Sequence, residues 1–243
     1  MSRAASELHV TQETIRRDLE VLEREGRLVR SHGGAIPIDA DRTELPLGVR
    51  EAVHLKQKRA IAACAAATIK EGQVIALDAS STARELARLI PDVPLTVVTN
   101  SLAAATALAD RAKVRVIVTG GVLDGPSHSF VGELATEVLD RFHFTRAFIS
   151  CQGIDIGRGL SVTADQQAGI KRRMLALADE SVLLADSSKF GVKAVEFFAK
   201  VTDVDTIITD RGADADLISK LRKAGVRVDI ASDSSLRRPG ACA

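Results

Sequence analysis

Short apolar runs that alternate with helical stretches from Lys58 onward constrain the fold of this 243-residue chain more than any other feature. Helices cover both faces of a parallel sheet, so its strands read as continuous apolar runs. We expect strands at residues 74–77, 95–98, 114–118, 147–150, 181–185, 206–209 and 226–230. We expect helices at residues 58–70, 83–89, 102–109, 131–140, 164–178 and 214–224. The alternation predicts an α/β domain with a mainly parallel sheet and helices on both faces.

The chain before Lys58 differs in composition and periodicity. Residues 1–36 are dense in charged and helix-forming side chains, whereas residues 37–57 begin with little periodicity and contain Pro37 and Pro46. We therefore predict a small N-terminal domain over residues 1–36, a linker and connecting helix over 37–57, and the α/β domain over 58–243. The connecting helix is expected to start at about Pro46.

Composition excludes several classes of protein. The 33 Lys and Arg residues nearly balance the 32 Asp and Glu residues, so any nucleic-acid site must come from a local arrangement. Aromatic residues make up only 3% of the chain, which argues against a base-stacking platform. The three cysteines lack metal-ligand spacing and fit a reducing compartment. Neither a signal peptide nor a membrane-spanning window is found, so we expect a cytoplasmic protein without metal or cofactor.

The N-terminal segment contains a well-marked helix start. Thr11 can cap a helix, with Val10 and Ile15 at the two positions of a hydrophobic staple. Ile15, Leu19 and Leu22 follow at helical spacing and predict a buried stripe. Polar side chains then occupy the remaining faces near the helix start, where the second helix of a helix-turn-helix meets base edges.

A short hairpin is predicted after Gly26, because alternation is followed by Gly33 and Gly34. Arg30 and His32 would point away from its apolar side toward phosphates or a groove. A solvated amphipathic helix followed by a turn explains the same residues, since residues 1–34 hold six Arg and six acidic side chains.

Three consecutive predicted strands end in loops of similar chemistry. Residues 78–82 read Asp-Ala-Ser-Ser-Thr, residues 99–101 read Thr-Asn-Ser, and residues 119–121 read Thr-Gly-Gly. Ligands of open parallel sheets bind at the carboxyl ends of strands, and a helix N-terminus with hydroxyl groups suits a phosphate. Each loop taken alone is also an ordinary helix cap or turn.

The second half of the chain adds charge and glycine. Lys189, in the stretch 186–191 after a predicted strand, could neutralise a phosphate, pair with Asp186 or be solvated. Gly153, Gly157 and Gly159 predict a tight loop without a dinucleotide-binding fingerprint. The helical run 171–173, Lys-Arg-Arg, is interpreted as mostly surface.

Two sets of motifs resemble the DeoR family of regulators. The stretch VTQETIRRDLEVLEREGRLVRSHGGA is similar to its winged helix-turn-helix, and KRAIA, LDxSST, VVTNS, TGG, FVGELA, GIDIGRGLS and DSSKFG follow in the order of its C-terminal sensor domain. The resemblance reaches to about residue 230. It implies a sensor domain similar in fold to ribose-5-phosphate isomerase and coenzyme A transferases, a phosphorylated sugar as effector, and release of operator DNA when the effector binds.

The resemblance also assigns residues. The DNA-binding residues that we predict on this basis and from the helix pattern are Thr11, Gln12, Thr14, Arg16, Arg17, Arg30 and His32. The predicted effector-binding residues are Lys58, Asp78, Ser80, Ser81, Thr82, Thr99, Asn100, Ser101, Gly120, Gly121, Gly153, Asp186 and Lys189. Operator symmetry leads us to expect a homodimer or homotetramer.

Two departures from the family pattern modify these expectations. Ser80 stands where the family usually has glycine, and a side chain there removes easy access to positive φ. The winged helix is expected to lack its first helix, because Met1 falls where that helix should have ended, and its apolar stripe would then be poorly covered. A sugar-phosphate isomerase with Asp78, Asp155 or Asp186 as base, and a sensor that no longer binds DNA, are the alternatives.

Overall fold

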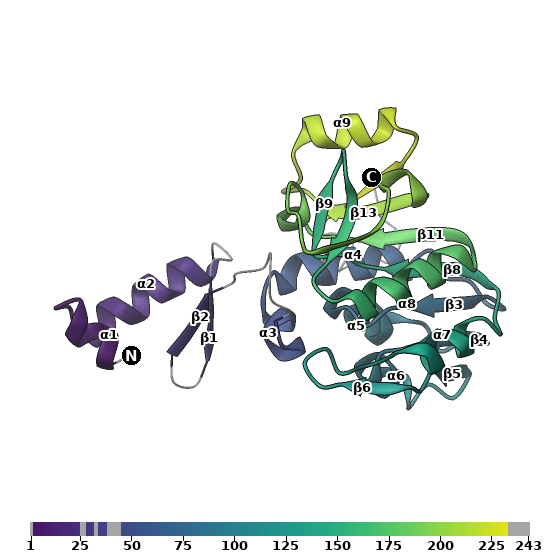
Figure 1. Cartoon of the computed structure of the whole chain (residues 1–243), viewed down its shortest axis with the longest axis horizontal. Helices are drawn as coiled ribbons and strands as arrows, with labels where there is room; N and C mark the ends of the chain where they lie inside the picture. Colours follow the sequence, from purple (N-terminus) through teal and green to yellow (C-terminus); the bar gives the residue numbers. More distant parts are fainter. Residues whose placement is uncertain (1, 25–27, 32–33, 38–44, 233–243) are drawn as a thin grey trace.

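The computed structural model describes residues 2–24, 28–31, 34–37 and 45–232, which form a small N-terminal segment and a larger α/β domain (Figure 1). The N-terminal segment consists of α1 (Ser2–Glu7), α2 (Gln12–Arg24), β1 (Leu28–Ser31) and β2 (Gly34–Pro37). The two strands pair antiparallel, which confirms the predicted hairpin. The Oγ1 atom of Thr11 accepts a hydrogen bond from the Thr14 amide at 3.1 Å, so Thr11 caps α2 as its sequence position predicts.

A seven-stranded sheet forms the centre of the larger domain. In spatial order its strands are β14 (Arg227–Ala231), β13 (Thr206–Asp210), β11 (Ala178–Leu184), β8 (Phe144–Ile149), β3 (Val74–Leu77), β4 (Leu95–Thr99) and β5 (Val114–Val118). Every neighbouring pair is parallel. All seven strands lie where the apolar runs predicted them, with ends that differ by at most three residues.

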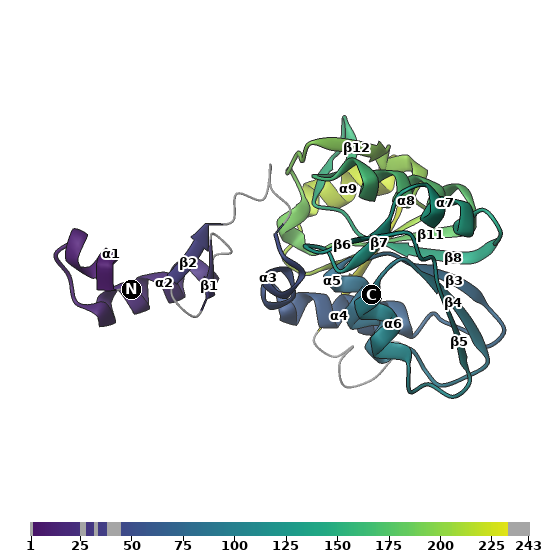
Figure 2. The same ribbon diagram turned by 60° about the horizontal axis from the view of Figure 1, so that its bottom comes forward.

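Helices cover both faces of this sheet, as predicted (Figure 2). One face packs on α4 (Leu55–Ala66), α5 (Ser81–Leu89) and α6 (Leu102–Leu108), and the other on α7 (Glu133–Leu139), α8 (Asp165–Ala176) and α9 (Ala215–Lys223). Successive side chains of each strand enter different cores: Ile75 and Leu77 join the cluster under α4, whereas Ala76 joins the opposite cluster. This double burial is the physical reason for the continuous apolar runs.

Antiparallel elements that the periodicity did not reveal complete the domain. A hairpin pairs β6 (Val122–Asp124) with β7 (Ser129–Val131), and a three-stranded sheet joins β9 (Gly153–Asp155), β10 (Gly159–Val162) and β12 (Glu196–Ala199). The predicted glycine loop is the β9–β10 hairpin. A Cβ atom at Gly153 would lie 2.4 Å from the Val192 carbonyl oxygen, so only glycine fits this close approach. Two 3₁₀ helices, η1 (Ser187–Lys189) and η2 (Val201–Asp203), follow β11 and β12.

The connecting segment carries α3 (Leu47–Ala52), which confirms the helix expected from about Pro46. Leu47 is buried, and its amide donates to the Pro126 carbonyl at 2.8 Å. The short helix packs against α5 of the larger domain. Among the described residues, no helix combines the length and the apolar character that crossing a bilayer requires.

Candidate anion-binding cavity

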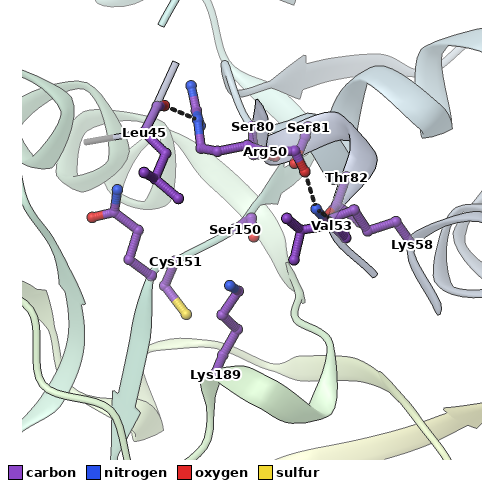
Figure 3. A pocket seen from close by; sticks show the side chains of 11 residues that line it. Leu45, Arg50, Val53, Lys58, Ser80, Ser81, Thr82, Ser150, Cys151 and Lys189 are labelled. Carbon is purple, nitrogen blue, oxygen red and sulfur yellow. Dashed lines mark hydrogen bonds between the residues drawn. The ribbon is translucent and has the colours of Figure 1, made fainter. Parts of the chain in front are cut away.

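A cavity of about 640 Å³, counting the part open to solvent, lies at the carboxyl ends of β3, β8 and β11. Five stretches of chain form its walls: the first turn of α5, the residues after β8, the end of η1, the segment around α3 and the start of α4 (Figure 3). The residues that line it are Leu45, Arg50, Val53, Lys58, Ser80, Ser81, Thr82, Ser150, Cys151, Gln152 and Lys189. An adjoining hollow shares five of these residues and extends to Ala79, Val162, Gln167 and Lys171.

The first turn of α5 forms one wall. Ser80 caps the helix, because its Oγ atom accepts from the Ala83 amide at 3.0 Å. Ser81 and Thr82 are buried and line the cavity, and the first amides of a helix have no partner within the helix. Ser80 has φ −86° and ψ 155°, an extended conformation that any residue adopts. A serine where the family usually has glycine therefore causes no backbone strain here.

Three cationic side chains line the cavity together with this helix start, and no acidic side chain is among the described residues that line it. They are Arg50 from α3, whose Nε atom donates to the Leu45 carbonyl at 2.9 Å, Lys58 from α4, and Lys189 from η1, which reaches in from the side opposite α5 (Figure 3). Positive charge beside the positive end of a helix dipole attracts an anion.

Lys58 is only 4% exposed and has two backbone partners. Its Nζ atom donates to the carbonyl oxygens of Arg50 and of Val53, the latter at 2.6 Å. Burial, assisted by the charge of Lys189 and opposed by Asp186, lowers the pKa of Lys58 to about 8. The ammonium group is therefore costly to keep charged at this buried position.

Asp186 lies behind the two lysines rather than in the cavity wall. It caps η1 by accepting from the Ser188 amide at 3.1 Å, and its Oδ2 atom is buried without a hydrogen-bond partner among the described residues. Burial acts to raise the pKa of Asp186, but Lys189, the Ser188 hydroxyl and Lys58 together hold it below its usual value. Asp186 is thus a buried counter-charge for the lysines.

Asp78 is 1% exposed and holds the cavity floor together. Its Oδ2 atom accepts from the Ser150 amide at 2.8 Å and forms an ion pair with Lys171, while its Oδ1 atom accepts from the Ser80 amide at 3.1 Å. Asp78 does not line the cavity, and a carboxylate engaged in this way is not placed to act as a general base. The interpretation of Lys171 as a surface residue was wrong, because its side chain is buried against Asp78.

The residues after β4 and β5 lie outside the cavity. Thr99 donates through Oγ1 to the Leu77 carbonyl at 2.7 Å, Asn100 donates through Nδ2 to the Phe130 carbonyl at 3.1 Å, and Ser101 caps α6. The structure therefore brings five of the predicted residues to the cavity: Lys58, Ser80, Ser81, Thr82 and Lys189. The predicted residues that do not line it are Asp78, Thr99, Asn100, Ser101, Gly120, Gly121, Gly153 and Asp186.

Sequence reasoning missed several lining residues. Ser150, Cys151 and Gln152 follow β8, so the strand-end rule applied to that strand would have found them. Arg50 and Gln167 carry no local signal, because they reach the site only through tertiary packing. Burial raises the pKa of the Cys151 thiol to about 12, which leaves it an unreactive thiol in the wall.

Five of the seven predicted DNA-binding residues are exposed at the start of α2. Ile15 is buried, whereas Val10 remains 39% exposed, so little of the expected staple between them is buried. Leu19 and Leu22 are half-buried. The five exposed residues are Thr11, Gln12, Thr14, Arg16 and Arg17, and Glu13, which is also exposed, forms an ion pair with Arg16 at 2.9 Å. The Arg30 backbone lies in β1 opposite Ala35, and His32 lies outside the described residues.

We predict that Asp78→Ala destabilises the protein by about 3–5 kcal/mol, because it leaves the Lys171 ammonium buried without its partner. Urea denaturation measures this loss. Asp140→Ala is the matched control, since its ion pair with Arg173 lies at the surface and is expected to contribute less than about 1 kcal/mol. Equal losses in the two variants would contradict the assigned role of Asp78.

Comparison with known proteins agrees with both parts of the chain. Residues 1–41 match the DeoR-like helix-turn-helix domain, and residues 53–211 match the DeoR C terminal sensor domain. The uncharacterized HTH-type transcriptional regulator YulB of Bacillus subtilis is 44% identical over 219 residues, covering 90% of this chain and 85% of that protein. The L-fucose operon activator of Haemophilus influenzae is 38% identical over 207 residues, covering 85% and 83%.

A more distant likeness concerns the fold alone. Ribose 5-phosphate isomerase A of Methanocaldococcus jannaschii superimposes with a TM-score of 0.41 at 18% identity, over 55% of this chain and 53% of that chain. The curated relatives are regulators of transcription rather than enzymes. With a helix-turn-helix domain followed by a sensor domain, the chain belongs to the DeoR family of DNA-binding transcriptional regulators.

Proposed function

We propose that the effector of this regulator is a phosphorylated sugar and that its phosphate binds in the cavity at the first turn of α5. The single observation that carries this proposal is that Arg50, Lys58 and Lys189 line the same cavity as the first turn of α5. Backbone amides and hydroxyl groups there are suited to phosphate oxygens, and the three cations are suited to its charge.

The adjoining hollow is suited to the sugar. Its polar groups include the Ser150 hydroxyl and the amides of Gln152 and Gln167, which can donate to and accept from hydroxyl groups. Lys171 also borders it, but its charge is balanced by Asp78. Arg50 borders both the hollow and the cavity. The other polar groups of the hollow are uncharged or, like Lys171, already paired, and they suit a neutral polyhydroxyl group.

The remaining assignments follow from the regulator's two parts. We assign DNA contacts to the start of α2 and to the β1–β2 hairpin. The chain is divided into a DNA-binding domain over residues 1–36, a linker with its connecting helix over residues 37–57, and a sensor domain over residues 58–243. A palindromic operator calls for a homodimer or homotetramer, and operator DNA calls for a cytoplasmic location. We propose that the protein represses a sugar-metabolism operon and that the effector relieves this repression. One relative is named an activator.

A panel of pentose and hexose phosphates tests the effector assignment by thermal shift. A ligand that binds the folded state raises the melting temperature. We expect at least one sugar phosphate to do so in the wild type, its unphosphorylated sugar to have no effect, and Lys189→Ala to need at least about tenfold more ligand, which corresponds to about 1.4 kcal/mol. Lys220→Ala, an exposed change on α9, serves as the control. An unchanged affinity in Lys189→Ala would refute the site.

The lowered pKa of Lys58 predicts a pH dependence of binding. A phosphate monoester is a dianion above about pH 6, so from pH 7 to 9 the ligand charge is constant. The Lys58 ammonium is lost as pH rises through about 8, so the dissociation constant should rise above that pH by at most about tenfold per unit. Lys58→Arg keeps its charge and should give a flat profile. Calorimetric titration checks both, and a flat wild-type profile would contradict the prediction.

Arg16→Ala is expected to weaken operator binding by about 1–3 kcal/mol, because Arg16 is exposed at the start of the predicted recognition helix. Fluorescence anisotropy measures the loss, with a duplex that the wild-type protein has selected from random-sequence DNA. Arg115→Ala, an exposed arginine on β5, is the control and should bind as the wild type does. If both variants bind alike, α2 is not the reading helix.

A further inference from the structure

The cavity wall formed by residues 45–53 is the wall nearest in sequence to the DNA-binding segment. Leu45, Arg50 and Val53 line the cavity from this stretch (Figure 3). Only residues 38–44 separate Leu45 from the end of β2. This wall is therefore the part of the cavity that lies nearest along the chain to the hairpin that is assigned to DNA.

The wall that contains α3 depends on its tertiary contacts for its position. The helix has six residues, far fewer than the roughly 12–15 at which an isolated helix becomes even marginally stable, so its position depends on its neighbours. Its contacts include the bond from the Leu47 amide to the Pro126 carbonyl, the burial of Leu47, the bond from Arg50 Nε to the Leu45 carbonyl and the ion pair between Glu51 and Arg84 of α5.

The wall formed by the start of α5 and the residues after β8 is fixed by comparison. The buried Asp78 carboxylate holds the amides of Ser80 and Ser150 and pairs with Lys171, which ties the starts of two cavity-lining loops to α8. Ser80 in turn caps α5. A ligand at the α5 start therefore rests on a rigid surface, and any adjustment on binding falls to the α3 wall.

Lys58 and Arg50 connect that adjustable wall to the ligand position. Lys58 Nζ donates to the Arg50 and Val53 carbonyls at the end of α3, and a lysine ammonium has a third hydrogen to donate. Arg50 lies on α3 itself and lines both the cavity and the adjoining hollow. A bound anion would thus share Lys58 with α3 and contact Arg50 directly.

We infer that Arg50 and Lys58 are positioning residues through which an anion in the cavity clamps α3 against α5 and thereby reports occupancy to the DNA-binding segment. This inference rests on the proposed function, since it requires a phosphate at the α5 start. The ligand acts only because it binds the docked position of α3, which supplies Arg50, more tightly than a displaced one. The affinity for the anion and the effect of the anion on α3 are therefore separable. Lys189 contributes to the affinity alone, whereas Arg50 contributes to both.

Hydrogen exchange of the full-length chain with inorganic phosphate as the probe tests this inference. Potassium chloride at equal ionic strength is the reference. In the wild type, saturating phosphate should slow exchange both at the α5 start, residues 81–84, and in the α3 segment, residues 46–53, the latter by about five- to tenfold. The first segment reports occupancy, and the second reports clamping.

Variants separate the two signals. In Arg50→Ala, saturating phosphate should still slow the α5 start, but exchange in residues 46–53 should change by less than about twofold; Arg50→Lys, which keeps the cation, should restore part of the effect. Lys189→Ala should require more phosphate and then reach the wild-type slowing in both segments. Full slowing of residues 46–53 in Arg50→Ala would overturn the inference. If phosphate slows neither segment of the wild type, the proposed function itself fails.

Discussion

The buried carboxylate of Asp78 is the interaction on which the site depends. Its two oxygens hold the backbone just after β3 and just after β8, and its charge is balanced by Lys171 from α8. Burial of one charge without the other would cost several kcal/mol, so the pair fixes α8 against the ends of two central strands. The cavity floor is rigid because these contacts leave it no alternative arrangement.

The cavity combines a floor that is held in place by Asp78 with a lining that carries positive charge. Ser80 caps α5 without strain, and the first turn of this helix lines the cavity together with Arg50, Lys58 and Lys189. Asp186 lies buried behind the lysines and moderates their mutual repulsion. A bound anion would offset the cost of keeping the buried Lys58 charged.

The chemistry at the strand ends was only partly predictable. The rule that ligands bind at the carboxyl edge of a parallel sheet directs attention to the edge where the cavity lies, and the predicted residues Ser81, Thr82 and Lys189 line that cavity. The rule could not say which of the strand ends meet at one cavity. The cavity lies at β11, β8 and β3, which are neighbours, whereas Gly120 and Gly121 follow β5 at the sheet edge and Asn100 follows β4. Spatial strand order, which no local motif encodes, decided which loops meet.

The sequence by itself determined the elements: apolar runs specified the parallel strands because both faces are buried, and the capped, amphipathic N-terminal stretch specified α2. Tertiary structure alone decided that Lys171 is buried with Asp78, that Asp78 supports the cavity rather than lining it, and that Arg50 joins the site from a connecting helix. The physical reason is that periodicity records only burial of a residue on its own element, whereas ion pairs and cavity walls depend on which distant elements pack together.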